Sequence, residues 1–382
     1  MTTETAGIPT EEAVRDTLRA AIQKVATGPE YSKDLPYEEA TGVMRALLSG
    51  DADPVQAGVY LIALRMKRET DDENRGSLQA ILEATDRAEA AVDELLDIAD
   101  PYDGFTRGLP VSPFLPAVLA ALGVPAFSHG LETVGPKYGI THRKVLRAAG
   151  VDVDRTPEQV AAQLADPDIG WGYVDQSRFC APLYALLPLR QRIVKRPVLT
   201  TVEVLAHPIR ARRKTHFMSG YVHKPYPRIY ALLARHTGFD SMLLVRGVEG
   251  GIVPSLKQAS VAWHYHAGGE ERPWEVEPQP LGIESQTRAV PLPPRFQVPT
   301  APDAIGPGFD VDEAAQAAAE AGLEALDGAG GPARDSLVYA GALALKHLGR
   351  YPTLLAAAQA VREVLASGAA KARFEAAPRS SH

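Results

Sequence analysis

Residues 53–67 read DPVQAGVYLIALRMK, a stretch with the features of a capped, amphipathic helix. Asp53 can accept hydrogen bonds at the N-cap, and Pro54 suits the first helical position. The apolar side chains that follow form a face for packing against other helices. A second helix start, Thr70-Asp71-Asp72-Glu73, comes directly afterwards, with acidic residues where the helix dipole favours them. Residues 1–95 are therefore predicted to form a small helical domain.

From about Leu95 onward, short apolar runs alternate with helical segments. This alternation is typical of an α/β domain with a mostly parallel central sheet flanked by helices. The candidate strands are Leu96–Ala99, Val124–Phe127, Val198–Val204, His216–Val222 and Met242–Val245; the candidate helices are Phe114–Leu122, Thr141–Ala149, Tyr226–Arg235, 310–326, 336–348 and 353–367. Residues 268–308 are predicted to be an irregular connection with one strand pair. The second domain is thus expected to cover residues 96–382, with the segment of about 175–195 as a candidate to pack with the helical domain.

Composition narrows the class of protein. The chain has 382 residues, is 45% apolar and carries a net charge of -7, which argues against non-specific nucleic-acid binding. Cys180 is the only cysteine, so an intrachain disulfide and a cysteine-based zinc site are excluded and a cytoplasmic location is expected. The N-terminus has no export-signal pattern, and the longest apolar run, 111–127, is interrupted by prolines and too short to cross a bilayer.

Three segments together resemble the anthranilate phosphoribosyltransferase family, within the wider nucleoside-phosphorylase-like group. Residues 34–67 are similar to that family's helical signature ending in A-L-R-x-K, and residues 123–130 to its strand and K-H-G turn. Residues 341–345 and 366–371 are similar to its C-terminal helices. The resemblance, in order and spacing, extends over roughly residues 30–375. It implies the family's two-domain fold, an anionic sugar phosphate as substrate, and a homodimer formed through the helical domain.

The loop after the first strand departs from the family pattern. In the family, a G-T-G-G-D turn wraps the pyrophosphate of phosphoribosyl pyrophosphate, because bare backbone amides must approach the phosphate oxygens. The matching positions read Asp100-Pro101-Tyr102-Asp103-Gly104. Gly104 retains the backbone freedom, whereas Asp100 and Asp103 add negative charge. The segment is either a plain Asp-Gly turn or a site in which the two carboxylates hold a cation or the hydroxyls of another ligand.

Two further loops match phosphate-binding positions of the family. Its N-x-S-T helix start corresponds to residues 110–113, where Ser112 is retained. His129 and Gly130 match the K-H-G turn. Beyond that turn, Thr133 and Lys137 lie in a glycine-containing segment that is either an anion-binding loop or a plain surface loop.

Magnesium is a possible cofactor by resemblance, but the family's adjacent Asp-Glu pair corresponds here to Ile252-Val253. Glu249 is the only carboxylate near those positions in the sequence, and two carboxylates are the usual minimum for such a site. No metal ligands are therefore assigned. Five further histidines lack a metal-ligand spacing and are expected to be structural: His216, His223, His236 and the His264–His266 pair.

A basic belt lies between Arg190 and Lys214, with eight cations and one acid, Glu203. It is either a solvated, salt-bridged surface or an anion site, since arginine forks suit carboxylates and phosphates. By resemblance, Arg190 or Arg192 lies close to the arginine that holds the anthranilate carboxylate in the family.

These features leave three functional hypotheses. The first is a glycosyltransferase acting on a ribosyl phosphate or a related anionic sugar phosphate, in a reaction other than anthranilate phosphoribosylation. The second is a non-catalytic relative that binds nucleic acid or another polyanion through a basic cleft. The third is a transferase or phosphorylase in which residues 100–104 form a new specificity loop. No catalytic residue is assigned from the sequence.

Overall fold

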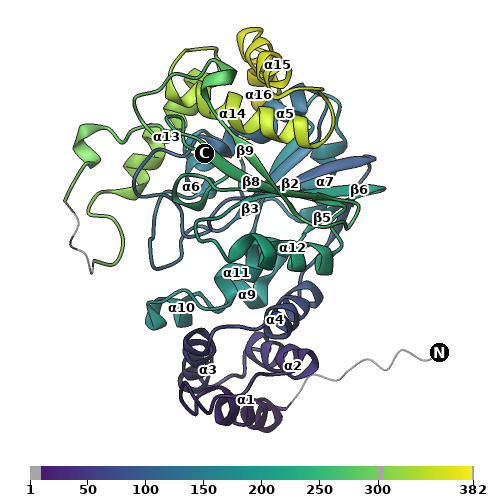
Figure 1. The fold of residues 1–382 in the computed structure, drawn as a ribbon, viewed down its shortest axis with the longest axis vertical. Coiled ribbons are helices and arrows are strands. Elements are labelled where there is room, and N and C mark those ends of the chain that lie inside the picture. Colours follow the sequence, from purple (N-terminus) through teal and green to yellow (C-terminus); the bar gives the residue numbers. More distant parts are fainter. Residues whose placement is uncertain (1–9, 300, 302–303, 381–382) are drawn as a thin grey trace. The chain divides into compact units, whose positions relative to one another are not determined.

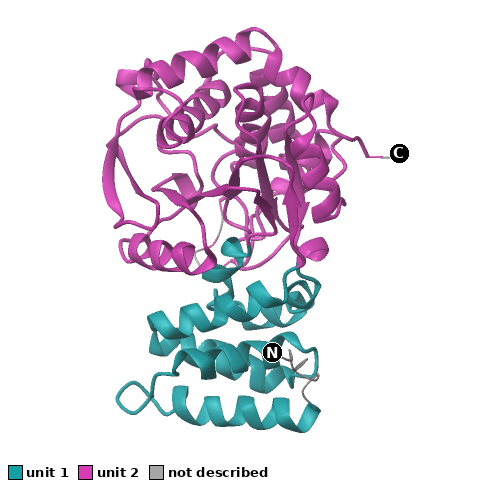
Figure 2. Cartoon of the chain, turned by 90° about the vertical axis from the view of Figure 1, so that its right-hand side faces the viewer, with its two compact units in different colours: residues 1–85, 180–206 teal, residues 86–179, 207–382 magenta. Residues whose placement is uncertain are grey.

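The computed structural model describes residues 10–299, 301 and 304–380. The chain folds into two compact units (Figure 2). The smaller comprises the residues up to Thr85 together with Cys180–Ala206, and the larger comprises Asp86–Phe179 together with the residues from His207 onward. The chain therefore leaves the smaller unit after Thr85, returns to it at Cys180, and leaves it again after Ala206.

The smaller unit is helical, as the sequence predicts. Its helices are α1 (Glu11–Val25), α2 (Tyr37–Leu48), α3 (Pro54–Lys67), α4 (Asp71–Glu83), α9 (Ala181–Tyr184), α10 (Leu187–Ile193) and α11 (Leu199–Val202). The side chain of Asp53 accepts from the amides of Val55 and Gln56 at the start of α3. Thr70 and Glu73 form a reciprocal capping box at the start of α4. Both helix starts are thus confirmed, because capping is a local property of the sequence.

The larger unit is an α/β domain with a mostly parallel seven-stranded sheet in the order β4-β3-β2-β6-β7-β8-β9. Strands β4 to β7 in this order are parallel, and β8 and β9 are antiparallel additions. The strands are β2 (Glu94–Ala99), β3 (Ala126–Gly130), β4 (Trp171–Asp175), β6 (Lys214–Gly220), β7 (Ser241–Val245), β8 (Ser260–His266) and β9 (Arg272–Val276); β1 (Ala88–Ala90) and β5 (Ile209–Ala211) form a separate parallel pair. The predicted fold class is confirmed.

Helices cover the central sheet (Figure 1). They are α5 (Leu115–Ala121), α6 (His142–Ala148), α7 (Pro157–Ala165), α8 (Gln176–Phe179), α12 (Tyr226–Thr237), α13 (Val311–Leu326), α14 (Pro332–His347), α15 (Leu354–Ala366) and α16 (Ala369–Ala376). One face of the sheet, with Ile98, Met218 and Leu243, belongs to the same hydrophobic core as α5 and α13–α16. Within the described residues, every helix is too short or too polar to span a bilayer.

The predicted strand Val198–Val204 is wrong. Its residues form α11 and the 3-10 helix Glu203–Leu205 in the helical unit. β-Branched residues favour strands only where a neighbouring strand can pair with them, and this segment instead packs among helices. Conversely, β4 was not predicted. Its Gly172 lets α7 approach closely, since a Cβ there would lie 2.5 Å from Val160, and glycine weakens the strand signal.

The strand pair β8–β9 covers 260–276, so it only partly overlaps the irregular segment 268–308 in which one pair was expected. Within that segment the structure forms two short 3-10 helices, Gln279–Leu281 and Pro294–Phe296.

Candidate functional site

Loops that follow three parallel strands meet at the carboxyl edge of the sheet in the larger unit. This is the edge at which open α/β sheets commonly bind ligands. The loop after β2 joins the loop after β3, since Phe105 and Ile140 exchange backbone hydrogen bonds of 3.0 and 2.8 Å. It also joins the loop after β7, through a hydrogen bond from the amide of Ile252 to Asp100. The candidate site is built from these three loops.

Asp100 is the centre of this junction and is only 3% exposed. Its Oδ1 accepts from the backbone amide of Ile252 at 2.8 Å. Its Oδ2 accepts from the hydroxyl of Ser112 and lies 2.8 Å from Nε2 of His142. The buried carboxylate of Asp100 thus lies where the resemblance places a phosphate-binding turn. It accepts hydrogen bonds from three donors, which are then not available to a ligand.

Glu249 fills a second anion position in the same junction. Its carboxylate accepts from the backbone amides of Thr106 at 3.0 Å and Arg107 at 2.7 Å, and from the Thr106 hydroxyl at 3.2 Å. Successive backbone amides that converge on one anion are the arrangement proteins use to hold phosphates. The chain therefore supplies its own carboxylate to these amides.

The space left between the loops is small. A cavity lined by Asp100, Ser112, Glu249, Ile252 and their neighbours has a volume of about 30 Å³. That is room for roughly one water, whereas small-molecule pockets measure about 300–1,000 Å³. In this conformation, this cavity is too small to hold a sugar pyrophosphate.

His129 is buried in a chain of hydrogen bonds beneath the loop after β2. Its Nε2 lies 2.8 Å from Oδ1 of Asp97, and its Nδ1 contacts the hydroxyl of Tyr102. With the ring neutral and Nε2 donating to Asp97, Nδ1 accepts from Tyr102. Burial raises the pKa of Asp97, while His129 acts in the opposite direction. Tyr102, inserted where the family has a glycine, therefore holds the altered loop on His129.

The glycine-containing loop after β3 lies against this altered turn. Gly104 has a φ of +75°, and a Cβ there would lie 2.6 Å from the carbonyl carbon of Gly139, so only glycine permits this approach. Lys137 Nζ lies 3.2 Å from Oδ1 of Asp103 and over the ring of Phe105. Thr133 is half-buried in the same loop. The predicted residues Asp103, Gly104 and Lys137 are thus brought together.

Gly130 is the last residue of β3. A Cβ at this position would lie 3.5 Å from the Tyr173 hydroxyl, an ordinary van der Waals distance, so close packing does not require glycine here. Immediately beyond it, Glu132 ties the loop to α6 through Arg143, Lys144 and Arg147. Burial alone would raise the pKa of Glu132, but the hydrogen bonds from Arg147 and Lys144 lower it to about 2. The cations of α6 are accordingly engaged in holding the loop.

Comparisons with known proteins agree with this architecture. Residues 19–85 match the helical bundle domain of a glycosyl transferase family, and residues 106–290 match its α/β domain. An anthranilate phosphoribosyltransferase from Nitrosomonas europaea is 27% identical over 344 residues, 90% of this chain and 93% of that protein. One from Stutzerimonas stutzeri is 30% identical over 258 residues, covering 66% of this chain and 71% of that protein. The chain belongs to the anthranilate phosphoribosyltransferase-like glycosyl transferase family.

A solved member of this family, the Saccharomyces cerevisiae anthranilate phosphoribosyltransferase in complex with phosphoribosyl pyrophosphate and magnesium, superposes with a TM-score of 0.72. The match covers 96% of this chain and 97% of that one, at 17% identity, and therefore shows a shared fold alone. The family's magnesium pair corresponds here to Ile252-Val253. Ile252 is fully buried, and the carboxylate of Glu249 is committed to the amides of Thr106 and Arg107. These residues do not fit a magnesium site of the family's kind.

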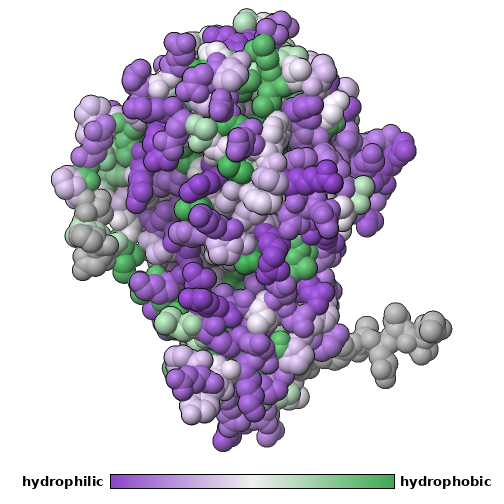
Figure 3. Space-filling view, viewed as in Figure 1, coloured by the Kyte–Doolittle hydropathy of each residue, from purple (hydrophilic) through white to green (hydrophobic). Residues whose placement is uncertain are grey.

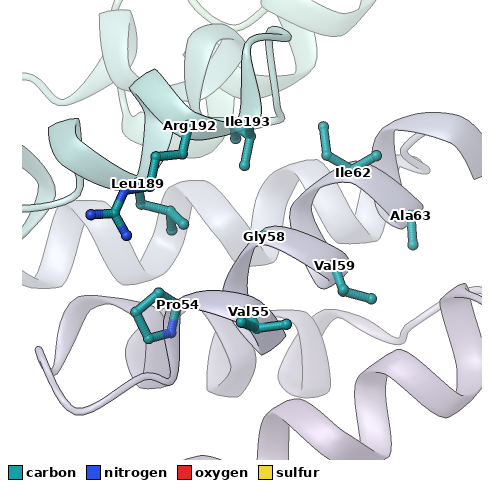
Figure 4. A pocket seen from close by; sticks show the side chains of 9 residues that line it. All are labelled: Pro54, Val55, Gly58, Val59, Ile62, Ala63, Leu189, Arg192 and Ile193. Carbon is teal, nitrogen blue, oxygen red and sulfur yellow. The ribbon is translucent and has the colours of Figure 1, made fainter.

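The two arginines that the family resemblance singled out lie in the helical unit. Arg190 is 3% exposed, and its guanidinium makes two hydrogen bonds of 2.6 Å to Glu203. Arg192 lines an open, mostly apolar pocket of about 570 Å³ on α3 and α10, together with residues such as Val55 and Val59 (Figure 4). Neither contact involves the loops of the larger unit, so we leave both arginines out of the site proposed below.

The basic belt is divided between the two units at residue 206. Besides Arg190, Arg210 lies 3.2 Å from Glu89, and Arg213 lies 3.8 Å from Asp93. These three cations are each paired with a carboxylate, as expected for a salt-bridged surface.

The sequence interpretation did not include Asp97, Tyr102, His142 or Glu249 in the site. A signal was present for Asp97, because a carboxylate within an apolar strand such as ELLDIA is rarely buried without a partner. Glu249 was noted only as the carboxylate nearest to the family's magnesium positions, and no signal identified His142, whose partners are distant in the sequence.

Proposed function

We propose that this family member is a cytoplasmic glycosyltransferase acting on an anionic sugar phosphate, and that it does not transfer phosphoribosyl groups to anthranilate. The proposal rests on the carboxylates of Asp100 and Glu249, which accept hydrogen bonds from backbone amides at the positions where the family binds phosphate. Family membership supports the reaction class, and the rebuilt loops support a changed substrate. The single cysteine in the sequence supports the cytoplasmic location.

The proposed ligand site is the loop after β3, with Lys137 as its cation. A phosphate that approaches this loop would replace Asp103 as the partner of Lys137, and the Thr133 hydroxyl offers a further donor. Reactions of this family type pass through an oxocarbenium-like centre, so that positioning and stabilisation of the leaving group do most of the catalytic work. Lys137 would neutralise the leaving phosphate in place of magnesium.

Ligand binding tests this proposal through thermal stability. A ligand that binds only the folded state at 100 times its Kd stabilises it by about 2.7 kcal/mol. We expect ribose 1-phosphate, whose phosphate is at the leaving position, to raise the melting temperature. Phosphoribosyl pyrophosphate with Mg²⁺ should give no larger rise, and a short oligonucleotide should give none.

The Lys137→Met variant should lose the response to ribose 1-phosphate, whereas Lys257→Met, at an exposed lysine of the same unit, should keep it. No response to any sugar phosphate, or an equal response in Lys137→Met, would rule out the proposed site.

We also propose that the chain forms a homodimer through its helical unit. Helix α3 exposes Val55, Val59 and Met66, which are 72%, 43% and 78% exposed, and apolar surface of this kind supports an interface. The face of the molecule in Figure 3 is mostly hydrophilic, with scattered apolar side chains. Light scattering should give a dimer for the natural protein and a monomer for Val59→Asp. The control Val222→Asp, at a 47% exposed valine of the larger unit, should stay dimeric; a monomeric natural protein would refute the proposal.

A further inference from the structure

Three histidines converge at the edge of the sheet opposite the candidate site. His264 and His266 are two residues apart on β8, so their side chains lie on the same face of the strand. His347 is the last residue of α14, which packs on that face. One ring nitrogen from each histidine lies within 4.8 Å of the others. All three residues belong to the larger unit, so their arrangement does not depend on how the two units sit.

A chain of hydrogen bonds fixes the orientation of His347. Its Nε2 lies 2.8 Å from the hydroxyl of Ser241, which lies 2.7 Å from Nδ1 of His216. His216 Nε2 lies 2.8 Å from Oε1 of Glu94. In register, Ser241 stands between His216 on β6 and His266 on β8, so these three side chains form one row across the sheet.

This chain also assigns the protons, taking both imidazoles as neutral. Glu94 can only accept, so His216 donates from Nε2 and accepts at Nδ1 from the Ser241 hydroxyl. The oxygen of Ser241 is then free to accept from Nε2 of His347, which leaves the lone pair of His347 on Nδ1. His347 is only 6% exposed, and this Nδ1 atom is buried and has no hydrogen-bond partner among the described residues. Within the same residues, Nδ1 of His264 is likewise buried and unpartnered.

We propose that His264, His266 and His347 bind a transition-metal ion of the zinc class, with an open fourth position for water. Neutral imidazole nitrogens are preferred ligands of Zn²⁺, Co²⁺, Ni²⁺ and Cu²⁺. A buried, unpaired nitrogen is costly without a partner, and the ion would supply that partner. The Ser241–His216–Glu94 chain resembles the outer hydrogen bonds that commonly hold a metal-bound histidine in place.

Binding requires a modest adjustment. Nitrogens about 2.1 Å from one tetrahedral ion lie about 3.4 Å apart, compared with up to 4.8 Å here. His266 is exposed and stacks on His347, with ring centres 4.3 Å apart. Its ring can therefore turn out of the stack toward the shared centre. Arg272 lies opposite His264 in the β8–β9 register, and its positive charge would repel a bound cation.

Calorimetry with ZnCl₂ on chelator-treated protein, prepared without a polyhistidine tag, tests the site. One Zn²⁺ per chain is expected, and Co²⁺ should give the visible absorption of a tetrahedral complex. His266→Ala, at an exposed position, should weaken binding at least 100-fold without affecting folding. Ser241→Ala should weaken it about 10–100-fold, the usual effect of removing an outer hydrogen bond.

The matched control is His223→Ala, which removes an exposed histidine elsewhere in the same unit and should bind Zn²⁺ as the natural protein does. No stoichiometric binding, or equal binding by the natural protein and His266→Ala, would overturn the proposal. Because the test does not depend on catalysis, its result is independent of the function proposed above.

Discussion

The Arg190→Ala variant is expected to lose about 3–5 kcal/mol of folding free energy, the usual cost of leaving one partner of a buried ion pair alone. The guanidinium is 3% exposed, and its two hydrogen bonds to Glu203 measure 2.6 Å. Removing it leaves the fully buried carboxylate of Glu203 without that cation. Urea unfolding should be followed by circular dichroism and tryptophan fluorescence together. Trp171, Trp263 and Trp274 all lie in the other unit, so loss of helical signal before any change in fluorescence locates the effect in the helical unit.

Arg192→Ala is the matched control, since this arginine is exposed on the same helix and should change stability by less than about 0.5 kcal/mol. The double variant Arg190→Met with Glu203→Leu should recover much of the loss, because apolar side chains of similar size remove both buried charges together. If Arg190→Ala is as stable as Arg192→Ala, then the role of Arg190 is not structural. That outcome would favour a ligand-binding role for Arg190.

The Asp100→Ala variant is expected to destabilise the larger unit by about 3 kcal/mol. The substitution removes the acceptor for the Ile252 amide, the Ser112 hydroxyl and His142. Hydrogen bonds to a charged group contribute about 1.5–3 kcal/mol each, and a buried amide without an acceptor costs about 1–3 kcal/mol. These contributions are not additive, which keeps the expected total below their sum. Tryptophan fluorescence during urea unfolding reports on this unit, which contains all three tryptophans.

Asp168→Ala, at an exposed aspartate of the same unit, provides the comparison and should be close to neutral. Asp100→Asn should fall between the two, because its amide oxygen can still accept from Ile252 while its NH₂ group cannot accept from Ser112. Asp100→Ala matching Asp168→Ala would show that the carboxylate does not hold the three loops together.

The fold was predictable from the sequence where local chemistry decides the structure. The caps at Asp53 and Thr70 specify helix starts whatever surrounds them, and both were confirmed. The segment 198–204 failed because the identity of a strand depends on its neighbours, which the sequence does not show. The fold class followed from the alternation of short apolar runs with helices, a pattern that one incorrect element does not change.

The site was only partly predictable, because its contacts join distant segments. The sequence indicated that the loop at 100–104 had changed, but not that Ser112, His142 and Ile252 would satisfy Asp100. The same limitation applies to the histidine cluster. His264 and His266 were expected to be structural, because they lack a metal-ligand spacing. His347, which lies beside them in the structure, is on a helix far along the chain.

The central claim is that this protein retains the family fold while its own carboxylates fill the phosphate cradle. The most direct measurement is formation of phosphoribosyl-anthranilate by the purified protein from anthranilate, phosphoribosyl pyrophosphate and Mg²⁺, followed by the loss of anthranilate fluorescence. We expect no turnover above the enzyme-free reaction at any Mg²⁺ concentration. Sustained, Mg²⁺-dependent turnover would contradict the claim, since it would require Asp100 and Glu249 to give up their amides to the substrate.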